Sequence, residues 1–547
     1  MRKLTFAATD SLAVGRRKFL KIAGNTTAAV MLRSWLEAKS TQNLVPPQPR
    51  PSLSYWCSWV TQNSPRTDDL RGTLANLNEE TLLHNPGWVS RHYEKIRGDL
   101  IVVLDEGWDL PPQTDVSKEI WPLGSLELQE EKFPSCGGSP AARLRKLNDM
   151  IRKLGWAGVG VWVPAQLQGD GRNGKLRPPE DVVPYWTERA RWCADAGIAY
   201  WKVDWGARSR SVDFRRTLSR IARGVAPGLR VEHAVIVRPV NEPQDGSGRF
   251  AHWTDVKERA FQTVAFSDVF RGYDILYQMP TATMLDRIAT LLQAAPALWE
   301  GPGFINSEDE VYLGAALGCT LGIMRHPQWR SSLDTEVNPV QYHKRIDEAV
   351  RAVRWQRIAP PVRIRDVRTV TDEHVLTDRY HFSTGQTWAT EVIGKEFTQS
   401  APARVARGMP LPSVVAPGDT PFVVASRHPN GAIAVAALER TLHQQIVAPR
   451  AAVEIEVGAG RHPIGIFGLY ESLILHATGL LKGCRIWAQD LAGDEAVDIT
   501  KRCFVEGTSV RLEGTLLADL GRIAQTPGDL SLRGLVIQLT LRSSVVG

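Results

Sequence analysis

Short apolar segments alternate with amphipathic helical segments over the first 360 residues, and this alternation constrains the fold most. Segments that are typical of buried strands occur at 53–60, 99–108, 158–164, 198–206, 229–235, 264–274, 295–301 and 318–324. Apolar residues at helical spacing predict helices between them, among others over 139–155, 182–197 and 213–224. Eight strands that alternate with helices predict a (β/α)8 TIM barrel, in which all strands are parallel.

The pattern changes after about residue 361. Helical spacing gives way to short alternating runs such as 374–382, 422–427 and 432–439. Asn430-Gly431 lies between two of these runs and is a strong signal for a β-hairpin. We therefore expect a C-terminal antiparallel β-sandwich. The predicted organisation is an N-terminal segment 1–39, a barrel 40–360 and a sandwich 361–547.

Nearly all of the net positive charge of the chain lies in its first 39 residues. The formal net charge is +7, yet residues 1–39 hold eight of the 66 basic and two of the 59 acidic residues, so the rest carries about +1. A nearly neutral body does not indicate a nucleic-acid surface. Arg16-Arg17, followed by Phe19, Leu20 and Lys21, resembles a twin-arginine export signal, which implies a periplasmic or secreted protein. The alternative is a disordered basic N-terminus on a cytoplasmic protein.

The sequence shows no features typical of membrane-spanning, disulfide-rich, metal-binding or nucleotide-binding proteins. No run reaches the roughly eighteen apolar residues of a membrane span. The six cysteines are scattered without CxxC or metal-ligand spacing, so neither a disulfide scaffold nor a metal site is expected. Nucleotide-binding motifs are missing as well. We therefore expect no cofactor, and the sequence leaves the oligomeric state open.

Charged and aromatic residues gather at the predicted ends of the strands, where the active site of such a barrel lies. In the segment "YWKVDWG", Lys202 and Asp204 share one face of a strand because side chains alternate. The other polar residues at strand ends are Asp105, Glu106, Glu232, His233, Arg271 and Asp274, with Trp56, Trp59, Trp108, Trp162 and Trp205 among them.

Carboxylates between indoles suit a pyranose sugar, whose C–H faces stack on aromatic rings and whose hydroxyls need hydrogen bonds. Cleavage of a glycosidic bond needs two carboxyl groups. Structural interpretations stand beside this one: Lys202 and Asp204 as an ion pair at the barrel rim, Trp162 as barrel filling, and His233 as a core histidine.

Several ordered segments resemble glycoside hydrolase clan D, the α-galactosidase or melibiase families 27 and 36. "SYWCSWVTQN" at 54–63 is similar to the tryptophan-rich first strand of these families, and "LDEGW" at 104–108 to their D-D-[CG]-W segment. "YWKVDWG" is similar to their K-x-D motif. "DVFRGYD" at 268–274 is similar to the segment with a substrate-binding arginine and the acid/base aspartate.

The resemblance implies a retaining glycoside hydrolase that needs no cofactor and acts on a carbohydrate. Asp204 would be the nucleophile and Asp274 the acid/base. The substrate-binding residues would be Trp56, Asp105, Glu106, Trp162, Lys202, Glu232 and Arg271. Glu106 stands where the families have a second aspartate, and the Arg271–Asp274 spacing is one residue shorter than usual in family 27, which leaves Asp268 as a rival acid.

The substrate implied by the resemblance is a terminal α-D-galactose-configured or β-L-arabinopyranose residue. The alternatives are another clan D specificity, such as that of an α-N-acetylgalactosaminidase, and a sugar-binding protein that has the same fold but no turnover.

Overall fold

The computed structural model describes residues 43–63, 70–84, 86–234, 253–272, 279–294, 298–327, 340–383, 394–521 and 528–540. The predicted export segment 1–39 and the proposed acid Asp274 lie outside these ranges. The twin-arginine signal therefore stays a prediction from the sequence.

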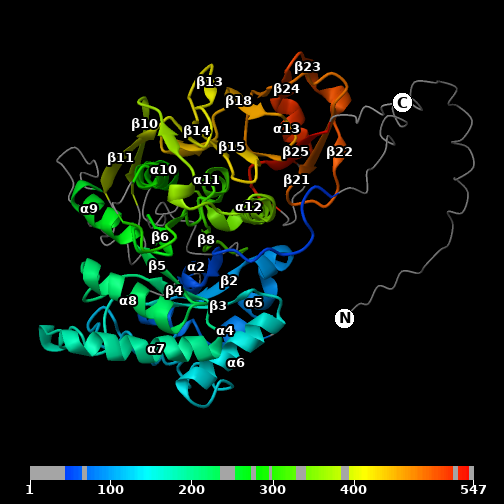
Figure 1. The fold of residues 1–547 in the computed structure, drawn as a ribbon. Helices are drawn as coiled ribbons and strands as arrows, with labels where there is room; N and C mark the ends of the chain where they lie inside the picture. Colours follow the sequence, from blue (N-terminus) through cyan, green and yellow to red (C-terminus); the bar gives the residue numbers. More distant parts are fainter. Residues whose placement is uncertain are drawn as a thin grey trace, which may run out of the picture.

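The N-terminal half is an eight-stranded parallel barrel (Figure 1). Its strands are β1 (Tyr55–Cys57), β2 (Ile101–Leu104), β3 (Gly158–Val163), β4 (Tyr200–Val203), β5 (Arg230–Ala234), β6 (Val269–Arg271), β7 (Phe304–Asn306) and β8 (Gly322–Ile323). Every neighbouring pair from β1 to β7 is parallel, and β8 pairs with β1. An isolated parallel bridge between Asn306 of β7 and Thr320, two residues before β8, links the last two strands. The predicted TIM barrel is confirmed.

The seventh strand lies elsewhere than the sequence predicts. Residues 298–301 of the expected strand 295–301 form no strand, and 295–297 are not described. Instead, Glu300 and Gly301 both donate backbone hydrogen bonds to Ala265 O, at 2.8 and 3.0 Å, which holds this segment in a turn. β7 begins at Phe304 and has three residues. So short a strand has no periodicity for a pattern to detect.

Helices follow the strands as expected. Between β2 and β8 they are α6 (Pro140–Lys153), α7 (Val182–Ala196), α8 (Val212–Val225), α9 (Trp253–Val264), α10 (Pro280–Leu292) and α11 (Val311–Leu317). The β1–β2 connection carries α2 (Trp59–Asn63), α3 (Leu70–Ala75), α4 (Glu79–Leu83) and α5 (Trp88–Arg91). The predicted start and end signals operate: the Ser139 side chain accepts from Ala142 N, and Gly197 ends α7 with φ of 68°.

Two tyrosines fill the lower part of the barrel. The rings of Tyr55 and Tyr200 lie 5.3 Å apart, and both side chains are fully buried. Glycines on neighbouring strands make room for them: a Cβ at Gly160 would lie 2.6 Å from Tyr200 Cβ, and one at Gly322 would lie 2.7 Å from the Tyr55 hydroxyl. The charged residues therefore occupy the layers above, toward the carboxyl ends of the strands.

The C-terminal half is a sandwich of two larger sheets. In spatial order, the first contains β22 (Val497–Asp498), β21 (Arg485–Asp490), β25 (Gly534–Thr540), β19 (Ile464–Gly468), β15 (Ile433–Leu438), β14 (Phe422–Arg427), β12 (Arg404–Arg407) and β9 (Thr369–Thr371). The second contains β13 (Ser413–Val415), β18 (Ala452–Gly458), β20 (Ser472–Ala477), β24 (Ser509–Glu513) and β23 (Phe504–Glu506).

The expected hairpin at Asn430-Gly431 joins the antiparallel strands β14 and β15. The sandwich is nevertheless mixed, because β12/β14, β15/β19 and β18/β20 are parallel pairs. Strand alternation in a sequence carries no information on which strands pair, so the prediction of an antiparallel sandwich was too narrow.

Helix α12 (Ile346–Ile358) joins the two halves and is buried along its whole length. Arg351 on this helix forms an ion pair with Asp490 of β21 at 2.8 Å, and Arg357 forms one with Asp99 on the barrel side at 2.7 Å. These ion pairs connect the helix, which lies between the two halves in Figure 1, to both of them.

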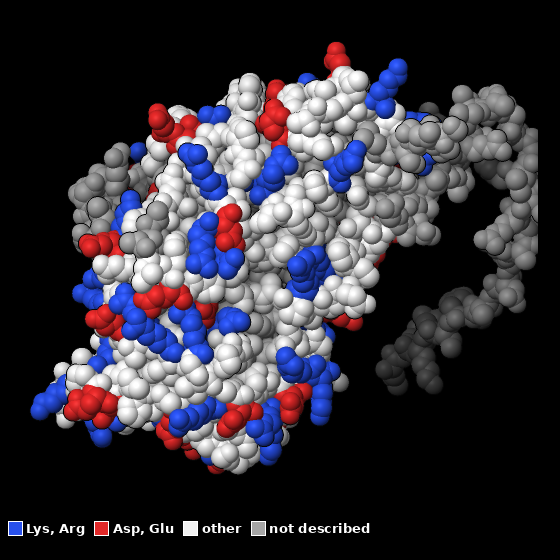
Figure 2. All heavy atoms as spheres, viewed as in Figure 1, with Lys and Arg blue, Asp and Glu red and all other residues white. Residues whose placement is uncertain are grey.

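The surface and the cysteines agree with the composition. On the face drawn in Figure 2, basic and acidic side chains are intermixed. All six cysteines are unpaired, and five of them are buried. Among the helices of the described ranges, none is both long and apolar enough to cross a bilayer.

Candidate functional site

Three strands bring charged side chains together at the carboxyl end of the barrel. Asp105 follows β2, Lys202 and Asp204 lie in and just after β4, and Arg271 ends β6. Two ion pairs connect them: Lys202 Nζ lies 2.6 Å from Asp105 Oδ2, and Arg271 Nη2 lies 3.0 Å from Asp204 Oδ1. The predicted cluster of charges therefore exists.

Asp204 is the accessible member of this cluster. Its side chain is 26% exposed, whereas those of Asp105, Lys202 and Arg271 are 5% exposed or less. Trp162 Nε1 donates to the second oxygen, Oδ2, at 3.2 Å. Burial favours the neutral acid, but Arg271 and then Lys202 outweigh it and lower the pKa of Asp204 to about 2. Asp204 is thus an oriented carboxylate anion that faces solvent.

Lys202 pairs with Asp105 rather than with Asp204. Burial opposes the charge on this lysine, yet the Asp105 carboxylate raises its pKa above the ordinary value. The Cys57 thiol donates to the same oxygen, Asp105 Oδ2, at 2.9 Å. The interpretation of Lys202 and Asp204 as a structural ion pair is therefore wrong, although the ammonium still contributes to the low pKa of Asp204.

Tryptophans form one wall beside Asp204. The rings of Trp162 and Trp205 lie 6.1 Å apart at an angle of 59°. Trp205 is half-buried, and its Nε1 donates to Glu106 Oε2 at 3.1 Å. Trp108 is fully buried and donates to the Trp162 carbonyl at 2.9 Å. Glu106 is therefore oriented toward the tryptophan wall.

Glu232 lies below the site and is fully buried. Its carboxylate accepts hydrogen bonds from the hydroxyls of Tyr55 and Tyr200 at 3.1 and 2.9 Å, and from Asn306 Nδ2 at 2.6 Å. Arg271 Nε lies 3.8 Å away. These hydrogen bonds engage both oxygens of the carboxylate, so Glu232 does not face substrate as predicted. It lies beneath Arg271 instead.

Trp56 does not reach the site. In β1, Tyr55 and Cys57 face the barrel interior, so Trp56 points outward and packs on His92 and Trp156 at 5.4 and 5.9 Å between ring centres. The prediction that Trp56 binds substrate is wrong for this reason. His233 faces away as well, with Nε2 2.8 Å from Ser219 Oγ, which supports its interpretation as a core histidine.

Asp268 lies at the opposite end of the barrel. It precedes β6, whereas Arg271 ends that strand. Its carboxylate pairs with Arg223 at 3.1 Å and accepts from Val231 N at 2.9 Å. A rival acid at this position is excluded because a whole strand separates Asp268 from the exposed carboxylate of Asp204.

Two residues that the sequence did not indicate complete the cluster. Glu308, in the loop after β7, is fully buried and lies 2.8 Å from Arg271 Nη1. Arg215 of α8 is also fully buried and donates to the backbone carbonyls of Asp204 and Ser209 at 2.7 and 2.9 Å. The misplaced seventh strand concealed Glu308, and nothing in a helical arginine marks Arg215 in advance.

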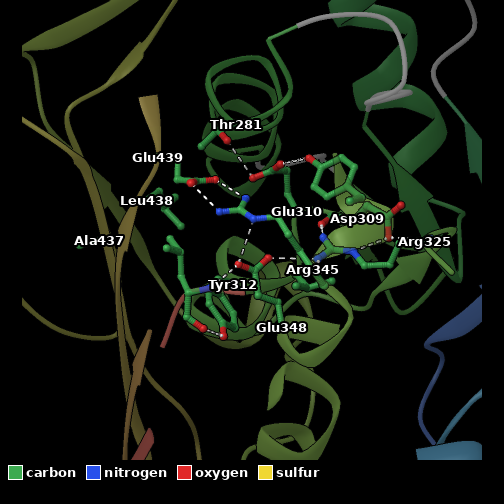
Figure 3. Close-up of a pocket in the computed structure, with 13 residues that line it drawn as sticks. Thr281, Asp309, Glu310, Tyr312, Arg325, Arg345, Glu348, Ala437, Leu438 and Glu439 are labelled. Carbon is green, nitrogen blue, oxygen red and sulfur yellow. Dashed lines mark hydrogen bonds and ion pairs between the residues drawn. The ribbon is translucent and has the colours of Figure 1, made fainter. Parts of the chain in front are cut away.

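A small polar cavity of about 30 Å³ lies elsewhere, between the loops after β7 and β8 and the sandwich (Figure 3). Arg345 pairs there with Glu439, and Arg325 with Asp309 and Glu348, while Thr281 and Tyr342 donate to Glu310. The volume accommodates one or two water molecules, so this cavity is a joint between the two halves and not a sugar pocket.

Metal ligation is not indicated in the part of the chain that the structure describes, where no group of three or more His, Cys, Asp or Glu side chains is arranged to hold an ion. The site described above is a set of carboxylates, cations and indoles at the active end of a TIM barrel.

Comparison with solved structures finds proteins of similar architecture. A family 27 β-L-arabinopyranosidase from Geobacillus stearothermophilus matches with 10% identity over 91% of this chain and 97% of its own, at a TM-score of 0.38. A variant of that protein in complex with arabinose matches over the same shares at 0.36. An α-galactosidase from Saccharomyces cerevisiae matches with 11% identity over 90% and 94%, at 0.36.

No protein-family model and no curated protein matches the chain. Structural likeness at these scores and identities establishes neither family membership nor an activity. The proposals below therefore rest on the residues of this chain.

Proposed function

We propose that the chain is a retaining glycoside hydrolase, similar to α-galactosidases, that releases terminal α-D-galactose-configured or β-L-arabinopyranose residues. One observation carries the proposal: Asp204 is a solvent-facing carboxylate at the active end of the barrel, with a pKa of about 2, a hydrogen bond from the buried Trp162 and the half-buried indole of Trp205 next to it in the chain. A nucleophile must be ionised at working pH, and a pyranose needs aromatic surface on which to stack.

The chemistry follows from the proposed roles. An oxygen of Asp204 attacks the anomeric carbon as the glycosidic bond breaks, and Asp274 protonates the departing oxygen. The product of this step is an ester between the sugar and Asp204. Asp274 then removes a proton from water, the water attacks the same carbon, and Asp204 leaves as a carboxylate. Two displacements return the original configuration.

Other residues bind and orient in this scheme. Asp105 and Lys202, whose charged atoms lie 2.6 Å apart, would take sugar hydroxyls together. Arg271 binds one oxygen of Asp204 and Trp162 donates to the other, so the carboxylate is held in one orientation. Arg215 fixes the backbone of Asp204 from below. Each contact restricts the nucleophile to one orientation. Such preorganisation supplies most of the rate advantage of an active site.

Glu106 directs the choice of sugar. It stands where the resembling families have an aspartate, and its extra methylene would occupy space that the C6 hydroxymethyl group of galactose needs. β-L-Arabinopyranose has the same hydroxyl arrangement without C6. We therefore propose that an aryl β-L-arabinopyranoside is hydrolysed with kcat/KM at least comparable to that of the α-galactoside.

A screen of aryl glycosides tests the proposal, with Asp204→Asn as the diagnostic variant. The wild type should release the aryl group from α-galactoside and β-L-arabinopyranoside with retained configuration, followed by NMR of the first product. Asp204→Asn should abolish release and remain folded, but its melting temperature should fall below that of the wild type, because a pKa lowered to about 2 means that the folded state favours the charged carboxylate.

Three outcomes would redirect the proposal. Sugar affinity without any release would indicate a non-catalytic sugar-binding protein. Wild-type rates in Asp204→Asn would remove Asp204 from the nucleophile role. Activity on an N-acetylgalactosaminide above both other substrates would favour the other clan D specificity.

A further inference from the structure

The guanidinium of Arg271 is shared by three carboxylates. Nη2 lies 3.0 Å from Asp204 Oδ1, Nη1 lies 2.8 Å from Glu308 Oε1, and Nε lies 3.8 Å from Glu232 Oε1. Asp204 therefore pairs with one terminal nitrogen of the guanidinium, Nη2, and Glu308 pairs with the other, Nη1. A planar guanidinium ordinarily gives both prongs to one carboxylate, since two parallel hydrogen bonds form without strain.

Glu308 is held in place by its backbone. Its φ of 48° is a left-handed conformation, which is uncommon for a residue other than glycine. Its N–H donates to Asn306 Oδ1 at 2.8 Å, and Asn306 Nδ2 donates to Glu232 at 2.6 Å. One asparagine thus fixes both carboxylates that share Arg271 with Asp204. Such backbone strain persists where the surroundings determine it, commonly at functional sites.

The position of Glu308 also decides the balance of charge. A lone arginine would cancel the charge of Asp204, whereas three carboxylates around one guanidinium leave the group negative. In the proposed reaction, positive charge develops on the sugar ring at the transition state. A negative surrounding stabilises that charge more than it stabilises the neutral substrate.

We propose that Glu308 is a positioning residue for Arg271, and this inference rests on the proposed glycosidase function. By holding Nη1, Glu308 limits Arg271 to a single contact with Asp204 and keeps the site negative where the sugar becomes positive.

Position and charge are tested by two variants. In a crystal structure of Glu308→Ala, Nη1 of Arg271 should turn toward Asp204 and form a two-pronged pair. Glu308→Gln keeps an acceptor and removes the charge. Glu308→Gln should lower kcat/KM for an aryl α-galactoside by about 10- to 100-fold. It should weaken the binding of a protonated galactose-configured iminosugar by the same factor. The affinity for neutral D-galactose should change less than about threefold. Glu308→Asp keeps the negative charge, so it should bind the iminosugar more tightly than Glu308→Gln does.

Asp268→Asn is the matched control. It removes a buried carboxylate beside an arginine at the opposite end of the same barrel, and it should leave both affinities unchanged. An equal loss of iminosugar and galactose affinity in Glu308→Gln, or an unmoved Arg271 in Glu308→Ala, would overturn the proposal. A wild type that hydrolyses no aryl glycoside would refute the proposed function instead, while the crystal structure of Glu308→Ala would still decide the positioning role.

Discussion

Replacing Arg271 by glutamine should move the acid limb of the pH–rate profile. In the wild type, Arg271 Nη2 lies 3.0 Å from Asp204 Oδ1, and the pKa of Asp204 is about 2. Only the ionised carboxylate attacks, so activity falls as the pH drops through this pKa. The wild-type kcat/KM should therefore show no loss from Asp204 protonation between pH 4 and 7.

The magnitude follows from the separation of the charges. Two unit charges about 4 Å apart at an effective dielectric constant of about 20 interact by about 4 kcal/mol. An opposite charge at this range lowers a carboxyl pKa by about one to three. Burial acts in the opposite sense to Arg271 and remains in the variant. Lys202 also remains and still lowers this pKa, so in Arg271→Gln the pKa of Asp204 should rise from about 2 by about one to three, to about 3 to 5, which brings the acid limb into the measurable range.

The assay is kcat/KM for an aryl α-galactoside between pH 3.5 and 7.5, with folding at each pH followed by tryptophan fluorescence. Arg223→Gln is the matched control, because Arg223 pairs with Asp268 at the other end of the barrel, 3.1 Å away. Its acid limb should coincide with that of the wild type. A lower but flat profile in Arg271→Gln would refute the electrostatic reasoning, since loss of a substrate contact alone lowers the rate at every pH.

Three further predictions concern specificity and stability. Glu106→Asp should raise the ratio of α-galactoside to β-L-arabinopyranoside kcat/KM by about 10- to 200-fold, the usual value of one methylene, and an unchanged ratio would contradict the role of Glu106. Burial lowers the pKa of His92 to about 3, so below pH 6.5 the unfolded chain binds a proton that the folded one does not. As the pH falls below 6.5, this group should lower the free energy of unfolding by about 1.4 kcal/mol per pH unit. Denaturation curves measured at several pH values should show that His92→Phe lacks this contribution to the pH dependence. Burial raises the pKa of Glu310 to about 7, so the folded state loses stability as the pH rises from 4.5 through 7; Glu310→Gln should gain in melting temperature over the wild type at pH 8 but not at pH 4.5, and an equal difference at both would contradict this.

The sequence by itself determined the barrel and one shared strand face. Repeated strand–helix units leave few other arrangements, and signals such as Ser139 before α6 and Gly197 after α7 act locally. The same holds for Lys202 on β4 and Asp204 just after it, which share one face because side chains alternate along extended backbone.

The tertiary structure alone decided which side each strand turns inward and which charges meet. Alternation relates Tyr55, Trp56 and Cys57 to one another, but only packing against His92 and Trp156 sends Trp56 outward. The partner of Lys202 is Asp105, 97 residues away, and the partners of Arg271 include Glu308, in the loop after a strand too short to show a pattern. Contacts between distant residues depend on how the strands close around the barrel, and local propensity carries no information about that closure.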